Sequence, residues 1–113
     1  MGYNLEKIHV MSDGDNDFIE AVVVAFIEEI PEDMIVFEKE VVAKNYGGIY
    51  QVSHKIKPNL ELLGMDAAFD LNFKILNWAK DETNIDEIAE NFPVLKGMID
   101  ENISGLKKEF KVS

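Results

Sequence analysis

The chain has 113 residues and a mass of 12.8 kDa, which allows one domain and excludes a second core of independent stability. Its 22 acidic residues against 11 basic ones give a formal net charge of -11. Such an acidic surface excludes proteins that bind nucleic-acid backbones or anionic membrane surfaces. The absence of cysteine excludes disulfides, thiolate metal sites and cysteine nucleophiles.

The sequence shows neither a membrane-spanning segment nor a signal peptide. Its longest apolar run, positions 21–27, has seven residues and is too short to cross a bilayer. The first residues lack the basic and apolar regions of a signal peptide. We therefore expect a cytoplasmic location, and Met1 and the polar Ser113 favour a complete small protein.

Apolar residues recur at helical spacing along nearly the whole chain, and no stretch alternates long enough to predict a strand. The predicted helices cover residues 5–11, 18–44, 46–63, 66–80 and 85–110, with bends at Pro31 and Pro93. Four substantial helices with short connections predict an all-α fold over residues 1–113. The expected architecture is an antiparallel up-and-down four-helix bundle with a short extra N-terminal helix.

Polar residues and glycine mark the predicted helix ends. The expected N-caps are Asp15 or Asn16, Asn45, Asp66 and Asn84. Asn84 and Glu87 have the spacing of a capping box. Gly64 is expected to end the third helix in the left-handed conformation.

The helix at 46–63 places its apolar and polar residues on opposite sides. Its predicted core face consists of Ile49, Val52, Ile56, Leu60 and Leu63. The opposite strip surrounds His54 and contains Gly47, Tyr50, Gln51, Lys57, Pro58 and Glu61. His54 should therefore face solvent, with Lys55 beside it and Lys57 one turn later. Neutral imidazole is a good nucleophile that titrates near physiological pH, and lysine suits the charge of a phosphoryl group.

This segment resembles the histidine-containing phosphotransfer (HPt) domain of multistep phosphorelay signalling. The run from His54 to Lys57, followed by Gly64 ten residues after the histidine, is similar to the motif His-x-Leu-Lys-Gly with its further glycine. The resemblance extends to the short first helix, the size of the chain, the Asp15–Phe18 helix start and the run Phe26, Glu29, Pro31.

The resemblance implies that His54 accepts a phosphoryl group from an aspartyl phosphate on a response-regulator receiver domain and passes it to another receiver. Lys57 would steady the phosphoryl oxygens. The family has no kinase activity of its own and no cofactor, and magnesium belongs to the receiver partner. The implied partners are receiver domains and a hybrid sensor kinase, and we expect a monomer. From the helix geometry, Gln51 is a supporting hydrogen-bond donor, and Lys55 softens the acidic field.

One residue departs from the motif. Pro58 stands where the family has glycine, and because proline has no N–H, the carbonyl of His54 loses its helical partner. Docking is expected on Tyr50, Pro58 and part of the first helix, including Ile8 and Met11, with small Gly47 at the rim.

Two other functions remain open. The first is a docking module of the same shape that binds a receiver or kinase without carrying phosphate, and Pro58 favours it. The second is an unrelated helical scaffold. Residues 13–17 look like a calcium loop but lack the glycine and glutamate that an EF-hand requires at its sixth and twelfth positions, so a helix cap is the better interpretation.

The remaining aromatic and histidine residues have ordinary interpretations. We expect Phe69, Phe73 and Trp78 in the core, with a partner-binding surface as the alternative. His9 is expected to be an ordinary surface or packing residue.

Overall fold

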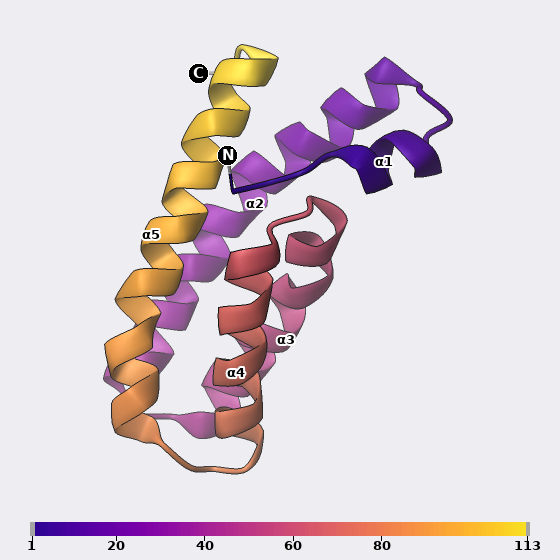
Figure 1. Cartoon of the computed structure of the whole chain (residues 1–113). Helices are drawn as coiled ribbons and strands as arrows, with labels where there is room; N and C mark the ends of the chain where they lie inside the picture. The colour runs from indigo at the N-terminus through magenta and orange to yellow at the C-terminus, as the bar shows by residue number, and fades with distance from the viewer. Residues whose placement is uncertain (1, 113) are drawn as a thin grey trace.

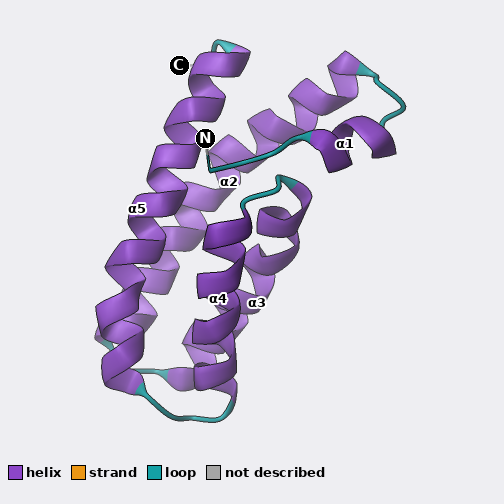
Figure 2. Cartoon of the chain, viewed as in Figure 1, coloured by secondary structure: helices purple, strands orange, loops and turns teal. Residues whose placement is uncertain are grey.

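The computed structural model describes residues 2–112, which form five α-helices with no strand among them (Figure 2). The helices are α1 (Glu6–Met11), α2 (Asn16–Val42), α3 (Tyr46–Leu62), α4 (Asp66–Lys80) and α5 (Ile85–Phe110). The prediction of an all-helical chain is confirmed, and every helix end lies within two residues of the expected position.

The four longer helices pack in a closed circuit. α2 and α4 each contact both α3 and α5, and successive long helices run in opposite directions (Figure 1). α2 and α5 have 27 and 26 residues, which at 1.5 Å per residue is about 40 Å. This length matches the longest dimension of the molecule, 42 Å. α3 and α4 are shorter, with 17 and 15 residues.

The N-terminal segment and α1 cover the end of the shorter α3–α4 pair. The backbone N–H of Asn4 donates to the carbonyl of Leu63 at 3.0 Å. Leu5 and Ile8 are buried in the common core, so α1 contributes to the packing of the longer helices. No helix of residues 2–112 combines the length and apolar character needed to cross a membrane.

The core follows the predicted apolar stripes. The rings of Phe37 on α2 and Phe92 on α5 lie 4.9 Å apart between centroids. Both side chains are at most 4% exposed. Burial of such stripes on every long helix is the main stabilising term of the fold.

The start of α2 confirms one predicted cap. The Asp15 carboxylate accepts the backbone N–H groups of Asp17 at 3.0 Å and Phe18 at 3.2 Å. Asn45 occupies the N-cap of α3, but its side-chain amide donates to Glu40 instead of capping the helix. The cap prediction is therefore right in position and wrong in side-chain role at Asn45.

The cap prediction at Asp66 is wrong, and the one at Asn84 is right in position but wrong in its capping box. Met65 is the N-cap of α4, and Asp66 is the first helical residue, where its charge still favours the positive end of the helix. Asn84 is the N-cap of α5 but has a left-handed backbone, with φ of 59° and no side-chain cap bond. A capping box with Glu87 requires an extended N-cap backbone, so it does not form.

Candidate functional site

The candidate site lies on α3, whose core face is confirmed. The five predicted core residues of this segment are all at most 5% exposed: Ile49, Val52, Ile56, Leu60 and Leu63. Because the helix turns about 100° per residue, burial of this face directs the opposite ridge to solvent. His54 lies on that ridge and is exposed.

The residues beside His54 turn toward two different neighbours. By helix geometry, Gln51 and Lys55 lie on the side of the ridge that faces α2, and Tyr50 and Lys57 lie on the other side. We call these the α2 flank and the α4 flank, because the contacts described below reach α2 from one and α4 from the other.

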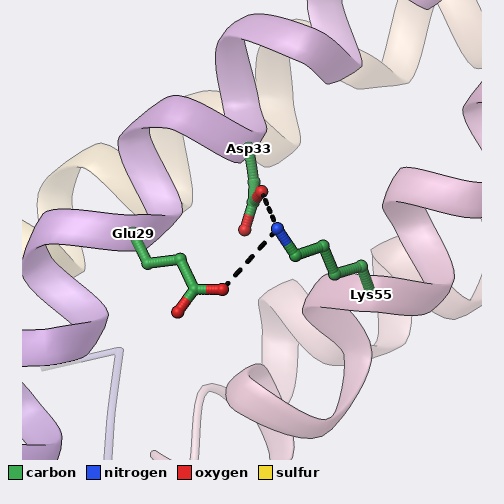
Figure 3. A network of polar contacts seen from close by, with 3 residues as sticks. All are labelled: Glu29, Asp33 and Lys55. Carbon is green, nitrogen blue, oxygen red and sulfur yellow. Dashed lines mark hydrogen bonds and ion pairs between the residues drawn. The ribbon is translucent and has the colours of Figure 1, made fainter.

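Lys55 forms an ion-pair network on the α2 flank (Figure 3). Its Nζ donates to Oδ1 of Asp33 at 2.7 Å and lies 3.6 Å from Oε1 of Glu29. The hydrogen bond and the negative charge of Asp33 raise the pKa of Lys55 above its ordinary value. The two carboxylates thus offset the charge of Lys55, which was expected to soften the acidic field at His54.

Asp33 is an unusual member of this network because it is only 6% exposed. Its Oδ2 is buried without a hydrogen-bond partner. Gln51, the predicted supporting donor, lines the same shallow groove of about 240 Å³ together with Asp33 and Lys55. Gln51 therefore lies beside the ion-pair network on the α2 flank.

The α4 flank is aromatic. The Tyr50 ring lies 5.7 Å from the His54 ring between centroids, tilted by 34°. Lys57 extends over the ring of Phe73 on α4, with Nζ 5.2 Å from the centroid. Phe73 is 41% exposed, so its assignment to the core is wrong, whereas Phe69 is half-buried against the core.

A buried polar pair lies under this flank. The Oγ of Ser53 donates to Oδ1 of Asn72 at 2.9 Å, and Nδ2 of Asn72 donates to the Ser53 carbonyl at 3.0 Å. Both residues are fully buried. Since Ser53 immediately precedes His54, these bonds fix α3 against α4 at the level of the exposed histidine.

Gly64, the glycine ten residues after His54, has a clear packing role. Its φ is 61°, so the predicted left-handed helix end is confirmed. A Cβ at this position would collide with the carbonyl oxygen of Asn4. Gly64 therefore lets the N-terminal segment pack against the turn between α3 and α4.

The two ends of the strip around His54 differ in character. Gly47 is exposed near the start of α3, and a Cβ there would meet only Oδ1 of Asn45 at 3.6 Å. At the other end, Glu61 forms an ion pair with Lys7 of α1 at 3.2 Å. Pro58 is exposed within a continuous α3 that extends to Leu62.

The predicted docking residues of α1 divide into two groups. Ile8 is 1% exposed, so its assignment to a docking surface is wrong: its side chain faces the core. Met11 is 68% exposed and Val10, which the sequence reasoning missed, is 75% exposed. Both line a groove of about 400 Å³ that also includes Glu61 and Gly64.

No protein-family model, curated protein or solved structure matches this chain. No group of three or more histidine, aspartate or glutamate side chains that could hold a metal ion occurs in residues 2–112. The site is therefore defined by its own geometry: an exposed imidazole between an ion-pair network and an aromatic flank with a lysine.

Proposed function

We propose that this chain is a histidine phosphotransfer protein whose phosphorylated residue is His54. The proposal includes the HPt-type architecture, an antiparallel up-and-down four-helix bundle with a short extra N-terminal helix. The circuit of contacts among α2, α3, α4 and α5 supports it. The observation that carries the proposal is the exposure of His54 on the ridge of α3, with Lys57 one turn later.

The proposed reaction is a reversible exchange between two phosphorylated side chains. The lone pair of one ring nitrogen of neutral His54 attacks the phosphorus of a receiver aspartyl phosphate. An N–P bond forms, the P–O bond to the aspartate breaks, and the aspartate leaves as a carboxylate. The other ring nitrogen keeps its proton as the product forms. Transfer to the next receiver aspartate reverses these steps.

Lys57 is the residue we assign to charge stabilisation. A transferring phosphoryl group carries charge on three oxygens, and a positioned ammonium stabilises that charge without a proton transfer. Residues three apart on a helix are surface neighbours, so the long side chain of Lys57 has the reach to contact a phosphoryl group on His54. Lys55 is held by Asp33 and Glu29 and has a lesser role.

In this proposal the chain carries phosphate without kinase activity or a cofactor of its own. Magnesium is supplied by the receiver partner. The proposed partners are response-regulator receiver domains and a hybrid sensor kinase, the proposed state is a monomer, and the proposed location is the cytoplasm. The docking surface would use Tyr50, Pro58 and Met11 around the exposed histidine.

The proposal is tested by incubating the purified chain with a receiver domain loaded from radiolabelled acetyl phosphate. We expect label to move to the chain and to be acid-labile and alkali-stable, as a phosphoramidate is. His54→Gln should abolish the label. His9→Gln is the matched control, because His9 is the other histidine and is also exposed.

The same experiment separates the alternative function. Label that survives His54→Gln would contradict the assignment of His54. A receiver that binds the wild-type chain and the His54→Gln variant equally, with no label on either, would favour the docking module that carries no phosphate. Pro58, which removes a helical N–H beside the site, is the feature that favours this second function.

A further inference from the structure

Lys57 differs from the lysines that form ion pairs. Among residues 2–112, carboxylates pair with Lys7, Lys55 and Lys96. Lys57 instead places its ammonium 5.2 Å from the centroid of the Phe73 ring, a cation–π geometry. The charged group assigned to phosphoryl stabilisation is therefore held by a neutral aromatic ring on the adjacent helix.

Phe73 is held in an exposed position by its neighbours. Its side chain is 41% exposed, and its ring lies 6.1 Å from that of Phe69, which is half-buried against the core. The Phe73 ring thus has an aromatic neighbour that packs against the core, while Lys57 from α3 lies over its face. The aliphatic stem of a lysine also covers apolar surface in such an arrangement.

We propose that Phe73 is a positioning residue for Lys57: it holds the ammonium on the α4 flank while His54 is unphosphorylated and releases it when His54 carries a phosphoryl group. This inference rests on the proposed function. Charge-assisted hydrogen bonds to phosphoryl oxygens are stronger than a cation–π contact at an exposed site, so the transfer of Lys57 is favourable. A neutral ring is better suited to this exchange than a carboxylate, which would compete with the phosphoryl group.

The contact stabilises only the unphosphorylated state, so its removal should favour phosphorylation. The strength of a cation–π contact at an exposed site corresponds to a change of about two- to five-fold in an equilibrium constant. Phe73→Leu should therefore raise the rate at which phosphoramidate, a small P–N donor that releases ammonia, phosphorylates His54 by about two- to five-fold. In a Lys57→Ala background the same substitution should have no effect on that rate.

Nuclear magnetic resonance tests the contact directly. The ring current of Phe73 should shift the ε-methylene protons of Lys57 upfield, and Phe73→Leu should remove this shift. Phosphorylation of the wild-type chain with phosphoramidate should also remove it, as the ammonium leaves the ring. Lys74 is an internal control, because its Nζ lies 5.4 Å from the Trp78 centroid on α4 and its shift should not change.

The outcomes separate this inference from the proposed function. A failure of phosphoramidate or of a loaded receiver to phosphorylate His54 would overturn the proposed function. Phosphorylation of His54 with an unchanged Lys57 shift would overturn the role of Phe73 alone, as would a rate gain from Phe73→Leu that persists in the Lys57→Ala background. Far-UV circular dichroism of each variant establishes that it is folded.

Discussion

The buried pair Ser53–Asn72 yields a sharp prediction about how the site is held. Removing the hydroxyl in Ser53→Ala leaves Oδ1 of Asn72 without its donor at a fully buried position. A buried polar group left unsatisfied costs about 1–3 kcal/mol. We therefore expect Ser53→Ala to lower the free energy of unfolding by about 2 kcal/mol, although it deletes a single atom from a small side chain.

The reciprocal change should cost a similar amount for a different reason. Asn72→Ala removes one donated and one accepted side-chain hydrogen bond, worth about 0.5–1.5 kcal/mol each. The Ser53 hydroxyl then keeps an acceptor, the backbone carbonyl of residue 72 at 3.2 Å. In this background Ser53→Ala creates no unsatisfied amide, so the second substitution should cost about 1 kcal/mol less than it does alone.

Urea unfolding measures these effects, with fluorescence of the single Trp78 as one probe and circular dichroism as the other. With a slope of about 1–3 kcal/mol per molar, each single variant should shift the midpoint by about 1 M. Asn77→Ala is the matched control, because Asn77 is exposed on the same helix, and it should shift the midpoint by less than about 0.3 M. Equal shifts for Ser53→Ala and Asn77→Ala, or costs that simply add, would refute the reasoning.

Four further predictions concern single contacts. Lys57→Ala should slow phosphorylation of His54 by about ten- to a hundred-fold in stopped-flow labelling. Because it also removes the contact with Phe73, it should lower the urea midpoint, but by no more than about 0.5 M. Asp33 raises the pKa of the Lys55 amine, so Asp33→Asn should speed acylation of Lys55 relative to Lys57, as measured by peptide mass spectrometry. An unchanged ratio of Lys55 to Lys57 acylation would contradict this. Burial and the Glu109 carboxylate raise the pKa of Tyr3 to about 12, so the unfolded chain loses this proton first and stability should fall between about pH 10 and 12. Tyr3→Phe should reduce that fall, and the difference in ultraviolet titration between the two proteins should have its midpoint near 12. A Cβ at Gly47 meets only Oδ1 of Asn45, at an ordinary contact distance, so Gly47→Glu adds bulk and charge at the rim and should weaken receiver binding in calorimetry. Binding of the wild-type chain should stay level or rise with salt, and a steep fall with salt would contradict the predicted apolar docking.

Periodic patterns predicted those features of α3 that depend on one helix alone. The spacing of Ile49, Val52 and Ile56 defined the buried face, and the exposure of His54 follows from that face by geometry. Gly64 was predicted to be left-handed from its place after the last apolar residue. Each of these inferences needs only the 3.6-residue period and the steric freedom of glycine.

Contacts between helices could not be predicted in the same way. Lys55 with Asp33, Ser53 with Asn72 and Lys57 with Phe73 join residues far apart in the sequence, and their meeting depends on how each helix is rotated about its axis. The position of Asp33 in the sequence did indicate a buried ion pair. It follows Ile30 by three positions on the apolar stripe of α2, and a charge at core spacing requires a partner.

The wrong predictions for Ile8 on α1 and for the capping box of Asn84 have local causes. α1 has only six residues, which gives too few positions to decide which side of the helix is buried, so Ile8 was assigned to the surface. At the start of α5, Asn84 has a left-handed backbone, and its side chain does not cap the helix. Sequence patterns locate such ends more reliably than they define the bonds made there.

The arrangement of charges about His54 also bears on how a phosphorylated partner would approach it. The net charge of -11 suggests uniform repulsion, but the two flanks differ locally. On the α2 flank, Lys55 is outnumbered by the carboxylates of Asp33 and Glu29. On the α4 flank, the ammonium of Lys57 lies over a neutral ring. A phosphoryl group at His54 would therefore be drawn toward α4, because Lys57 lies one turn from His54 and its ammonium is held by a neutral ring instead of by carboxylates. The orientation of the group would then be set by which neighbour each lysine contacts, and two lysines separated by a single residue would have different roles.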